Sequence, residues 1–122
     1  MATDNATPGK NPANVSGLHR NSVEALRDIA SLAAGCDRVV FVSGNFNIVH
    51  PGHLRLLRFA AECGDFLVVG VNDNSSAGAL LEEELRFDSV RSVSFVNYAF
   101  ILRDKPEVFI SHLRPDIVVK GK

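Results

Sequence analysis

The sequence predicts an α/β domain in which helices cover both faces of a doubly wound parallel sheet. Two unbroken apolar runs, residues 39–42 and 66–71, are typical of strands that are buried on both faces. The segment between them has the length of a helix, with Pro51 at the first helical position and Gly64 at its end. A strand, a helix and a second strand in this order form a parallel unit with a right-handed crossover.

Further elements are expected on both sides of this unit. A helix capped by Asn21, with Glu24 in the capping-box position and a stop at Gly35, precedes the first strand. Residues 72–87 are predicted to be a loop with a short helix, and residues 88–99 to be helical. The remaining predicted elements are a short strand at 100–102, a helix over 106–113 and a last strand at 117–119.

The length and the net charge of the chain exclude several classes of protein. The 122 residues fit one domain, expected over residues 21–122 after a flexible leader at residues 1–20. A net charge of −1 gives no general attraction to nucleic acid or to a membrane surface, and no apolar run is long enough to span a membrane. Without a signal peptide, we expect a cytoplasmic protein in which Cys36 and Cys63 are reduced, buried thiols.

The turn between the first strand and the following helix, residues 44–53, carries the most chemical information. It matches neither the dinucleotide pattern G-x-G-x-x-G nor the P-loop. His50 and His53 are three residues apart around the helix start, so both imidazoles can face the same side. Gly52 leaves room for a ligand, and the free N–H groups and partial positive charge of a helix start suit a phosphate.

The local charge supports a phosphate site in this turn. From Arg38 through Ala61 the chain has no Asp or Glu, so no carboxylate there would repel a polyphosphate. A metal site is the alternative, but two histidines are an incomplete zinc set, and no Cys or carboxylate stands close to them in the sequence. No metal-ligating residue is therefore assigned.

The pattern Gly44-x-Phe46-x-x-x-His50-x-Gly52-His53 resembles the HxGH nucleotidyltransferases. The chain is most similar to the cytidylyltransferase-like enzymes and to the nucleotidyltransferase domain that makes ADP-heptose. The similarity continues through residues 64–72 and resumes at residues 113–121. The resemblance implies a Rossmann-like fold with strand order 3-2-1-4-5, Mg²⁺, and transfer of a nucleotidyl group from ATP or CTP to a small phosphorylated acceptor.

The resemblance also implies roles for individual residues. His50 and His53 would be catalytic, stabilising charge on the α-phosphate and on the leaving pyrophosphate. Arg91 lies near a family arginine that contacts phosphates, although an exposed helical Arg is an equal interpretation, and Lys120 is either a site residue or a solvated Lys. The nucleotide-binding residues implied by the resemblance are Gly44, Asn45, Phe46, Asn47, Gly52, Arg91 and Lys120.

The chain departs from the family pattern in three places. The family commonly has Asp at the position of Asn47. It often uses a Lys after the second strand, where this chain has none and where Arg86 is the candidate replacement. The family continues with another strand beyond the position of Lys122. We therefore expect residues 117–119 to form an open sheet edge, and the chain to be a homodimer or part of a longer multidomain protein.

Three functions follow from these observations. The first is a nucleotidyltransferase that acts on a sugar or polyol phosphate, with AMP favoured over CMP because residues 115–121 resemble the heptose enzymes. The second is a catalytically impaired nucleotide-binding module, regulatory or fused to a sugar kinase domain. The third is a different adenylyltransferase, for example one that makes a coenzyme, because the His-x-Gly-His motif is widely shared.

Overall fold

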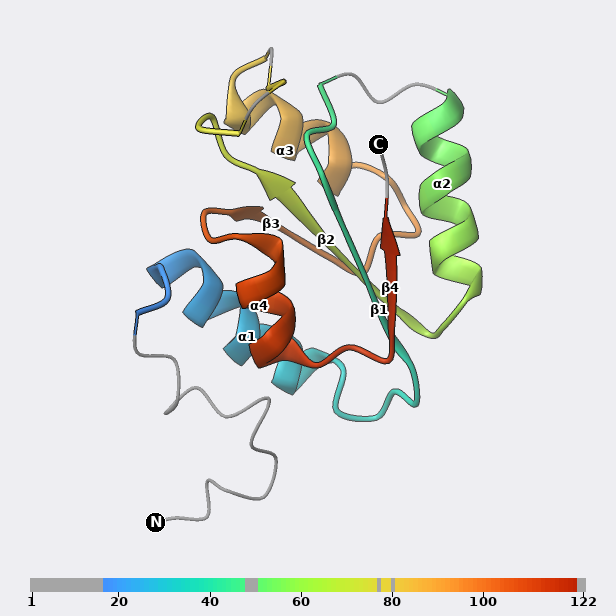
Figure 1. Ribbon diagram of the computed structural model, residues 1–122. Helices are drawn as coiled ribbons and strands as arrows, with labels where there is room; N and C mark the ends of the chain where they lie inside the picture. The colour runs from blue at the N-terminus through green and yellow to red at the C-terminus, as the bar shows by residue number, and fades with distance from the viewer. Residues whose placement is uncertain (1–16, 48–50, 77, 80, 121–122) are drawn as a thin grey trace.

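The computed structural model of the chain describes residues 17–47, 51–76, 78–79 and 81–120 (Figure 1). In this part of the chain one parallel sheet has the order β3-β2-β1-β4, which confirms the doubly wound arrangement. The strands are β1 (Val39–Gly44), β2 (Phe66–Asn72), β3 (Tyr98–Leu102) and β4 (Ile117–Lys120). The helices are α1 (Arg20–Leu32), α2 (Pro51–Glu62), α3 (Glu83–Arg91) and α4 (Pro106–Leu113).

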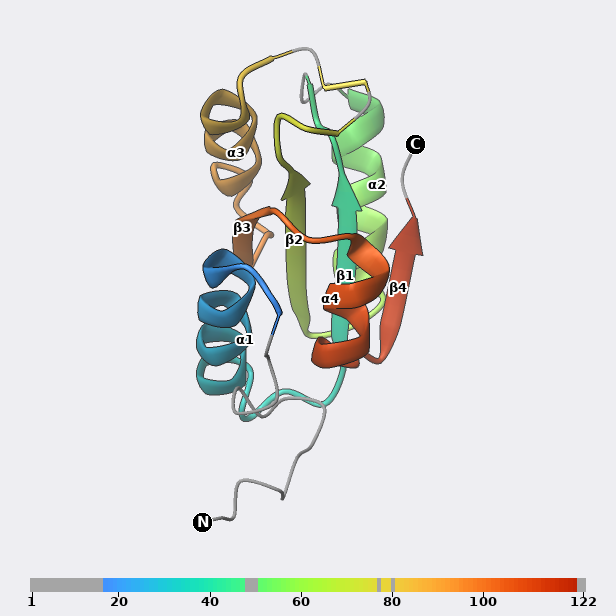
Figure 2. The same cartoon turned by 60° about the vertical axis from the view of Figure 1, so that its left-hand side comes forward.

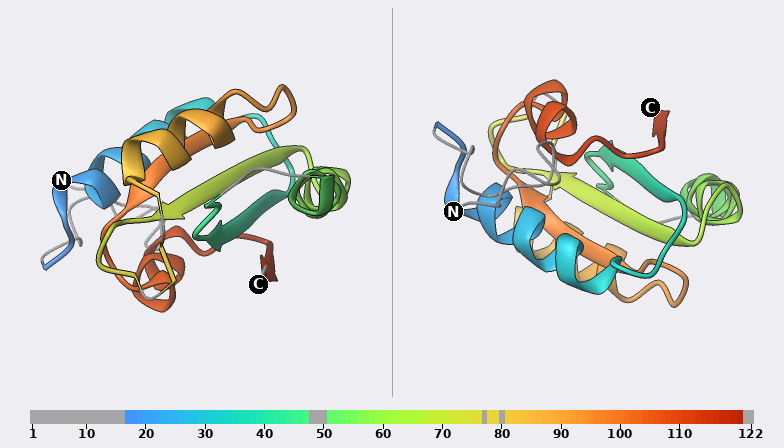
Figure 3. Two further views of the ribbon diagram at one scale, coloured as in Figure 1. Left: turned by 90° about the horizontal axis from the view of Figure 1, so that it is seen from above. Right: turned by 90° about the horizontal axis from the view of Figure 1, so that it is seen from below.

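The helices form two layers around the sheet (Figures 2 and 3). Helices α1 and α4 pack on one face, and α2 and α3 on the other. Along β1, Val39 and Phe41 face the first layer, whereas Val40 and Val42 face the second. Burial on both faces explains why β1 is apolar at every position instead of alternating with polar residues. The same requirement accounts for the apolar run in β2.

The region between β2 and β3 differs from its prediction. The helix expected over 88–99 is wrong in its limits: α3 spans Glu83–Arg91, and residues 98–99 already belong to β3. The helix starts early because the Glu82 side chain caps it, accepting a hydrogen bond from the backbone N–H of Glu84 at 3.0 Å. Val93 and Val96 are partly buried in the segment that follows α3. Their spacing is the same as that of apolar residues on one face of a helix, which explains the wrong prediction.

The start of α1 also differs from its prediction. The cap is His19, whose Nδ1 accepts from the backbone N–H of Asn21 at 3.0 Å, and the helix ends at Leu32, before Gly35. Asn21 instead donates its side-chain amide to the carbonyl of Ile101, which joins α1 to the end of β3. Residues 1–16 of the expected leader lie outside the described residues.

The two cysteines are free, as expected, but they are half-buried and not fully buried. Cys36 follows α1 and packs at the margin of the α1–α4 core, while Cys63 follows α2 and packs at the margin of the other core. Cys63 lies in the turn directly after α2, and Cys36 lies in the segment between α1 and β1.

The last strand lies at an edge of the sheet, as predicted for residues 117–119. β4 pairs with β1 through the register Val40↔Ile117 to Ser43↔Lys120, and among the described residues no strand pairs with its other side. Val118 is 42% exposed there. In the same described ranges, no helix has the length and apolar character that crossing a membrane would require.

Gly64 lies in the turn between α2 and β2 and tests how closely this turn packs on the start of β1. A Cβ added there would lie 2.6 Å from the carbonyl oxygen of Arg38 and 2.7 Å from a methyl carbon of Val40, whereas a Cβ at Gly35 would meet nothing within 4 Å. We expect Gly64→Ala to lower the free energy of unfolding by ~1–3 kcal/mol, as overpacking does, and Gly35→Ala to leave it nearly unchanged. Urea denaturation measures both, and equal effects would contradict the described packing.

Candidate functional site

The carboxyl ends of the four strands bring three loops to one edge of the sheet (Figure 1). Parallel α/β sheets bind their ligands at this edge. Gly44 ends β1, Asn45 to Asn47 follow it, and Gly52 and His53 lie in the first turn of α2. Lys120 ends β4 beside Ser43 of β1. His50 lies outside the described residues, so the structure says nothing of its position.

Phe46 connects the end of β1 with the start of α2. Its backbone is left-handed, with φ of 52°, and its side chain is only 4% exposed. A Cβ at Gly44 would lie 3.2 Å from the Phe46 ring, so a glycine there gives the ring its space. The ring meets the His53 imidazole edge-on, with 5.7 Å between centroids. The buried phenyl ring therefore fixes one side of the His53 imidazole.

Two asparagines join this loop to the segment that follows β2. The carboxamide oxygen of Asn45 accepts from Asn72 Nδ2 at 3.0 Å and from Ser76 Oγ at 2.8 Å. The Asn47 amide donates to the carbonyl of Gly78 at 2.7 Å, and its oxygen accepts from the N–H of Leu81 at 3.4 Å. An aspartate at position 47 would have no N–H for the carbonyl, which gives a structural reason for the asparagine in this chain.

Arg86 is fully buried beneath the same loops. Its Nε donates to the carbonyl of Leu81 at 2.7 Å, and Nη2 donates to the Asn74 side chain at 3.2 Å. Its Nη1 donates to the carbonyls of Asn45 and Asn72 at 2.8 and 2.5 Å. Because these donors are taken up by the protein, the interpretation of Arg86 as a replacement for the phosphate-binding lysine is wrong. The signal for burial was its place one helical turn before the apolar Val90.

A second charged group lies between the β2–α3 loop and the end of β3. The Glu83 carboxylate is paired with both terminal nitrogens of Arg103 and accepts from the backbone N–H of Asn74 at 3.0 Å. Arg103 also lies 3.6 Å from an oxygen of Asp73. The hydrogen bond from Arg103 holds the pKa of Glu83 below its ordinary value, although burial acts in the opposite direction. Glu83 is therefore an anion tied to Arg103.

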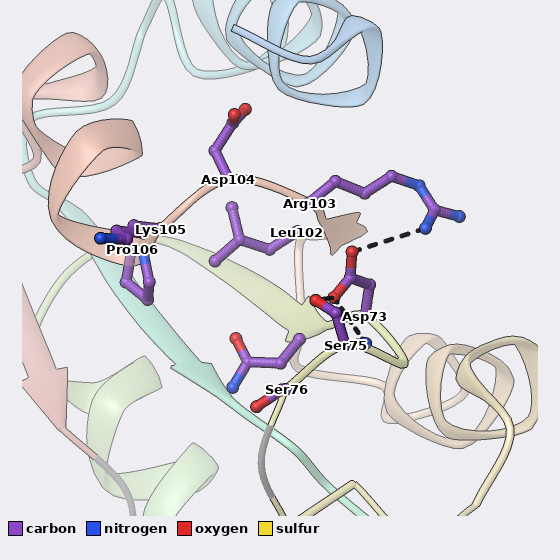
Figure 4. A pocket seen from close by; sticks show the side chains of 9 residues that line it. Asp73, Ser75, Ser76, Leu102, Arg103, Asp104, Lys105 and Pro106 are labelled. Atoms are coloured by element: carbon purple, nitrogen blue, oxygen red, sulfur yellow. Dashed lines mark hydrogen bonds and ion pairs between the residues drawn. The ribbon is translucent and has the colours of Figure 1, made fainter.

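A pocket of about 240 Å³ opens between the ends of β2 and β3 (Figure 4). Its wall combines hydroxyl, amide, cationic and carboxylate groups, a mixture that suits a small polar molecule. One of its two carboxylates, Asp104, accepts from Ser22 and from the backbone of His19, and is thereby engaged with α1. The lining residues are Asn72, Asp73, Ser75, Ser76, Leu102, Arg103, Asp104, Lys105 and Pro106.

Arg91 is not brought to this edge. It ends α3, which runs back from the carboxyl edge of the sheet towards the start of β3. Its guanidinium is paired with Asp88 at 3.0 Å and lies over the ring of Phe87, 5.4 Å from the centroid. These contacts favour the alternative interpretation, in which Arg91 is an exposed helical arginine. We therefore leave Arg91 out of the proposed site.

The expected Mg²⁺ would need oxygen ligands near the carboxyl ends of the strands. Among the residues with a described position, no three His, Cys, Asp or Glu side chains gather in a way that could hold a metal ion. Mg²⁺ is commonly held by substrate phosphates together with only one or two protein carboxylates. The described groups are compatible with a metal that arrives on a nucleotide.

Comparison with known proteins identifies the family. The family model described as cytidylyltransferase-like matches residues 41–122, which include the His53 turn, the pocket, most of β1 and all of β2, β3 and β4. The chain belongs to the cytidylyltransferase-like family. Membership confirms the resemblance drawn from residues 44–53 and 113–121, and it agrees with the Rossmann-like sheet.

The relatives agree with this assignment. The chain is 38% identical over 108 residues to the bifunctional protein HldE of Campylobacter concisus, covering 82% of this chain and 23% of the relative. With the bifunctional protein HldE of Trichlorobacter lovleyi it shares 30% identity over 136 residues, covering 99% of this chain and 28% of the relative. The chain thus spans about a quarter of the length of these relatives.

A solved structure supports the same fold. The lipopolysaccharide core biosynthesis protein from Thermoplasma volcanium superposes with a TM-score of 0.61 at 28% sequence identity. The match covers 66% of this chain and 71% of that protein.

Asn47→Asp tests the hydrogen bonds that join the turn after β1 to the segment after β2. The substitution removes the donor to the Gly78 carbonyl and places a carboxylate oxygen against it, so we expect a loss of ~0.5–1.5 kcal/mol in the free energy of unfolding. Asn97→Asp is the matched control, because the Asn97 oxygen accepts from Leu67 and an aspartate keeps that bond. Chemical denaturation of both variants checks the prediction, which fails if Asn47→Asp is the milder change.

Glu83→Gln tests the ion pair with Arg103. A carboxyl whose pKa is lowered by folding stabilises the protein above its unfolded value of 4.5, and this contribution is lost as the pH falls through the folded value. We expect the variant to be less stable at pH 7 by ~1–3 kcal/mol and to lose less stability than the wild type on acidification. Glu62→Gln, an exposed change on α2, is the control. Parallel pH profiles of the melting temperature for wild type and Glu83→Gln would contradict the assignment.

Proposed function

We propose that this domain transfers a nucleotidyl group from a nucleoside triphosphate to the phosphate of a sugar or polyol phosphate, with release of pyrophosphate. One observation carries the proposal. In a chain of the cytidylyltransferase-like family, the turn that holds His53 is hydrogen-bonded, through Asn45, to the wall of a polar pocket. In this proposal the turn binds the triphosphate, the pocket binds the second substrate, and both lie at the carboxyl ends of the strands.

The triphosphate is proposed to lie against the first turn of α2. The N–H groups of this turn and its partial positive charge favour an anion, and the neighbouring sequence has no carboxylate to repel it. His53, held by the Phe46 ring, is proposed to stabilise charge on the α-phosphate and on the leaving pyrophosphate. The resemblance assigns the same task to His50. Gly44, Phe46 and Gly52 would form the adjacent wall.

The phosphorylated acceptor is proposed to occupy the pocket between β2 and β3. Ser75, Ser76 and Asn72 line the pocket with hydroxyl and amide groups, and Lys105 contributes positive charge, whereas Arg103 is already paired with Glu83. An oxygen of the acceptor phosphate attacks the α-phosphorus while the bond to the β-phosphate oxygen breaks, and pyrophosphate leaves with that electron pair. The protein contributes alignment and positive charge and needs no covalent intermediate. Mg²⁺ bound to the phosphates supplies charge neutralisation when present.

The transferred group is proposed to be AMP, because residues 115–121 resemble those of the heptose enzymes. A second candidate is a nucleotide-binding module without catalysis. It is favoured by Asn47, which stands where the family has an aspartate and whose side chain is engaged with Gly78 and Leu81. The two candidates differ in turnover and not in nucleotide binding.

Pyrophosphate release separates these functions. The chain is incubated with ATP or CTP, Mg²⁺ and a panel of sugar and polyol phosphates, and nucleotide binding is followed in parallel by thermal shift. Release that depends on one acceptor supports the transferase, with ATP expected to exceed CTP. Binding of nucleotide without release supports the module. If no nucleotide binds, both candidates are wrong.

His53→Ala tests the assigned catalytic role. If the imidazole stabilises transition-state charge, kcat should fall by roughly 10²–10³, the loss that follows removal of one electrostatic donor. The melting temperature should change little, because His53 lies outside both buried clusters. His112→Ala on α4 removes a histidine that contacts its own helix, and should leave kcat unchanged. An unchanged kcat in folded His53→Ala would exclude the role.

A further inference from the structure

Arg86 joins three segments that carry different parts of the candidate site. Its Nη1 donates both to the carbonyl of Asn45, in the turn before α2, and to the carbonyl of Asn72, in the pocket wall. Its Nε donates to the carbonyl of Leu81, and the backbone N–H of the same residue donates to the side-chain oxygen of Asn47. The guanidinium is fully buried, so its position is fixed by these contacts and not by solvent.

Asn45 links the side chains of the pocket wall to the turn that carries His53. Its carboxamide oxygen receives the two pocket groups Asn72 Nδ2 and Ser76 Oγ. The next residue in the chain is Phe46, whose ring packs against the His53 imidazole. A continuous set of contacts therefore leads from the pocket wall through Asn45 and Phe46 to His53.

We propose that Arg86 and Asn45 are positioning residues that hold the His53 turn in a fixed relation to the pocket, so that the two substrates meet in line. This inference rests on the proposed function. Transfer between two bound molecules depends on their mutual placement, and an error of about 1 Å in that placement can reduce the rate ~10²-fold. Each binding surface alone survives such an error, because its own groups stay together.

The shape of the guanidinium suits this task. Its planar fork sends hydrogen bonds to Asn45, Asn72 and Leu81 from two nitrogens, and to Asn74 from the third. A lysine at position 86 keeps the positive charge but offers donors from a single atom, so it cannot reach all of these acceptors at once. Arg86→Lys therefore changes the geometry while conserving charge.

The first readout needs no substrate. In a ¹H–¹³C spectrum of the full chain, the ring signals of His53, assigned with His53→Gln, report its distance from the Phe46 ring. We expect these signals to move in Arg86→Lys and in Asn45→Ala, while those of His19 and His112 stay in place. Asn97→Ala is the matched control, because it removes an asparagine that holds the start of β2, away from the pocket.

The second readout is kinetic. In Arg86→Lys and Asn45→Ala we expect kcat for pyrophosphate release to fall ~10–100-fold, with KM for the nucleotide changed less than about threefold. A purely structural role would lower the melting temperature and the folded fraction without changing kcat for each folded molecule. Asn97→Ala should show that structural pattern.

The outcomes separate the two proposals. If the wild type releases no pyrophosphate with any substrate pair, the proposed function fails, and the His53 signals still decide the positioning role. If Arg86→Lys does not fold, Asn45→Ala and the milder Ser76→Ala, which removes one donor to Asn45, take its place. Folded variants with wild-type His53 signals, or with wild-type kcat, overturn the inference.

Discussion

A single buried guanidinium organises the carboxyl edge of this sheet. Removing a charged side chain from water is costly unless its donors are satisfied, and Arg86 satisfies them with three backbone carbonyls and one side-chain oxygen. Those carbonyls belong to three separate segments: the turn after β1, the end of β2 and the loop before α3. Their convergence on Arg86 brings the turn before α2 and the wall of the β2–β3 pocket to one place.

The glutamates near Arg86 in the sequence are mostly engaged with other groups of the protein. The run Glu82 to Glu84 stands near Arg86 in the sequence, and free carboxylates there would repel a phosphate. In the structure Glu82 caps α3 and Glu83 is paired with Arg103. Two of the three carboxylates are thus engaged within the protein, while the turn with His53 keeps a sequence without Asp or Glu. The separation leaves the α2 start suited to an anion.

The sequence was sufficient to predict the sheet but not the contacts between its loops. β1 and β2 were evident because burial on both faces requires an apolar residue at every position. The limits of α3 were missed because Val93 and Val96 pack into the core from turns. Asn45 is hydrogen-bonded to residues 27 and 31 positions away, and no local pattern reports such a partner. Arg91 matched a family position in sequence, yet α3 carries it to the other edge of the sheet.

The central claim is that the carboxyl edge around His53 binds a nucleoside triphosphate. The most direct measurement is a titration of the isotope-labelled full chain with ATP or CTP in the presence of Mg²⁺, followed by backbone and histidine NMR signals. The account predicts that the largest changes fall on residues 44–47, Gly52 and His53, with little change at Gly64 and Asn97 on the opposite edge. Changes centred on that opposite edge, or no saturable change with either nucleotide, would contradict it.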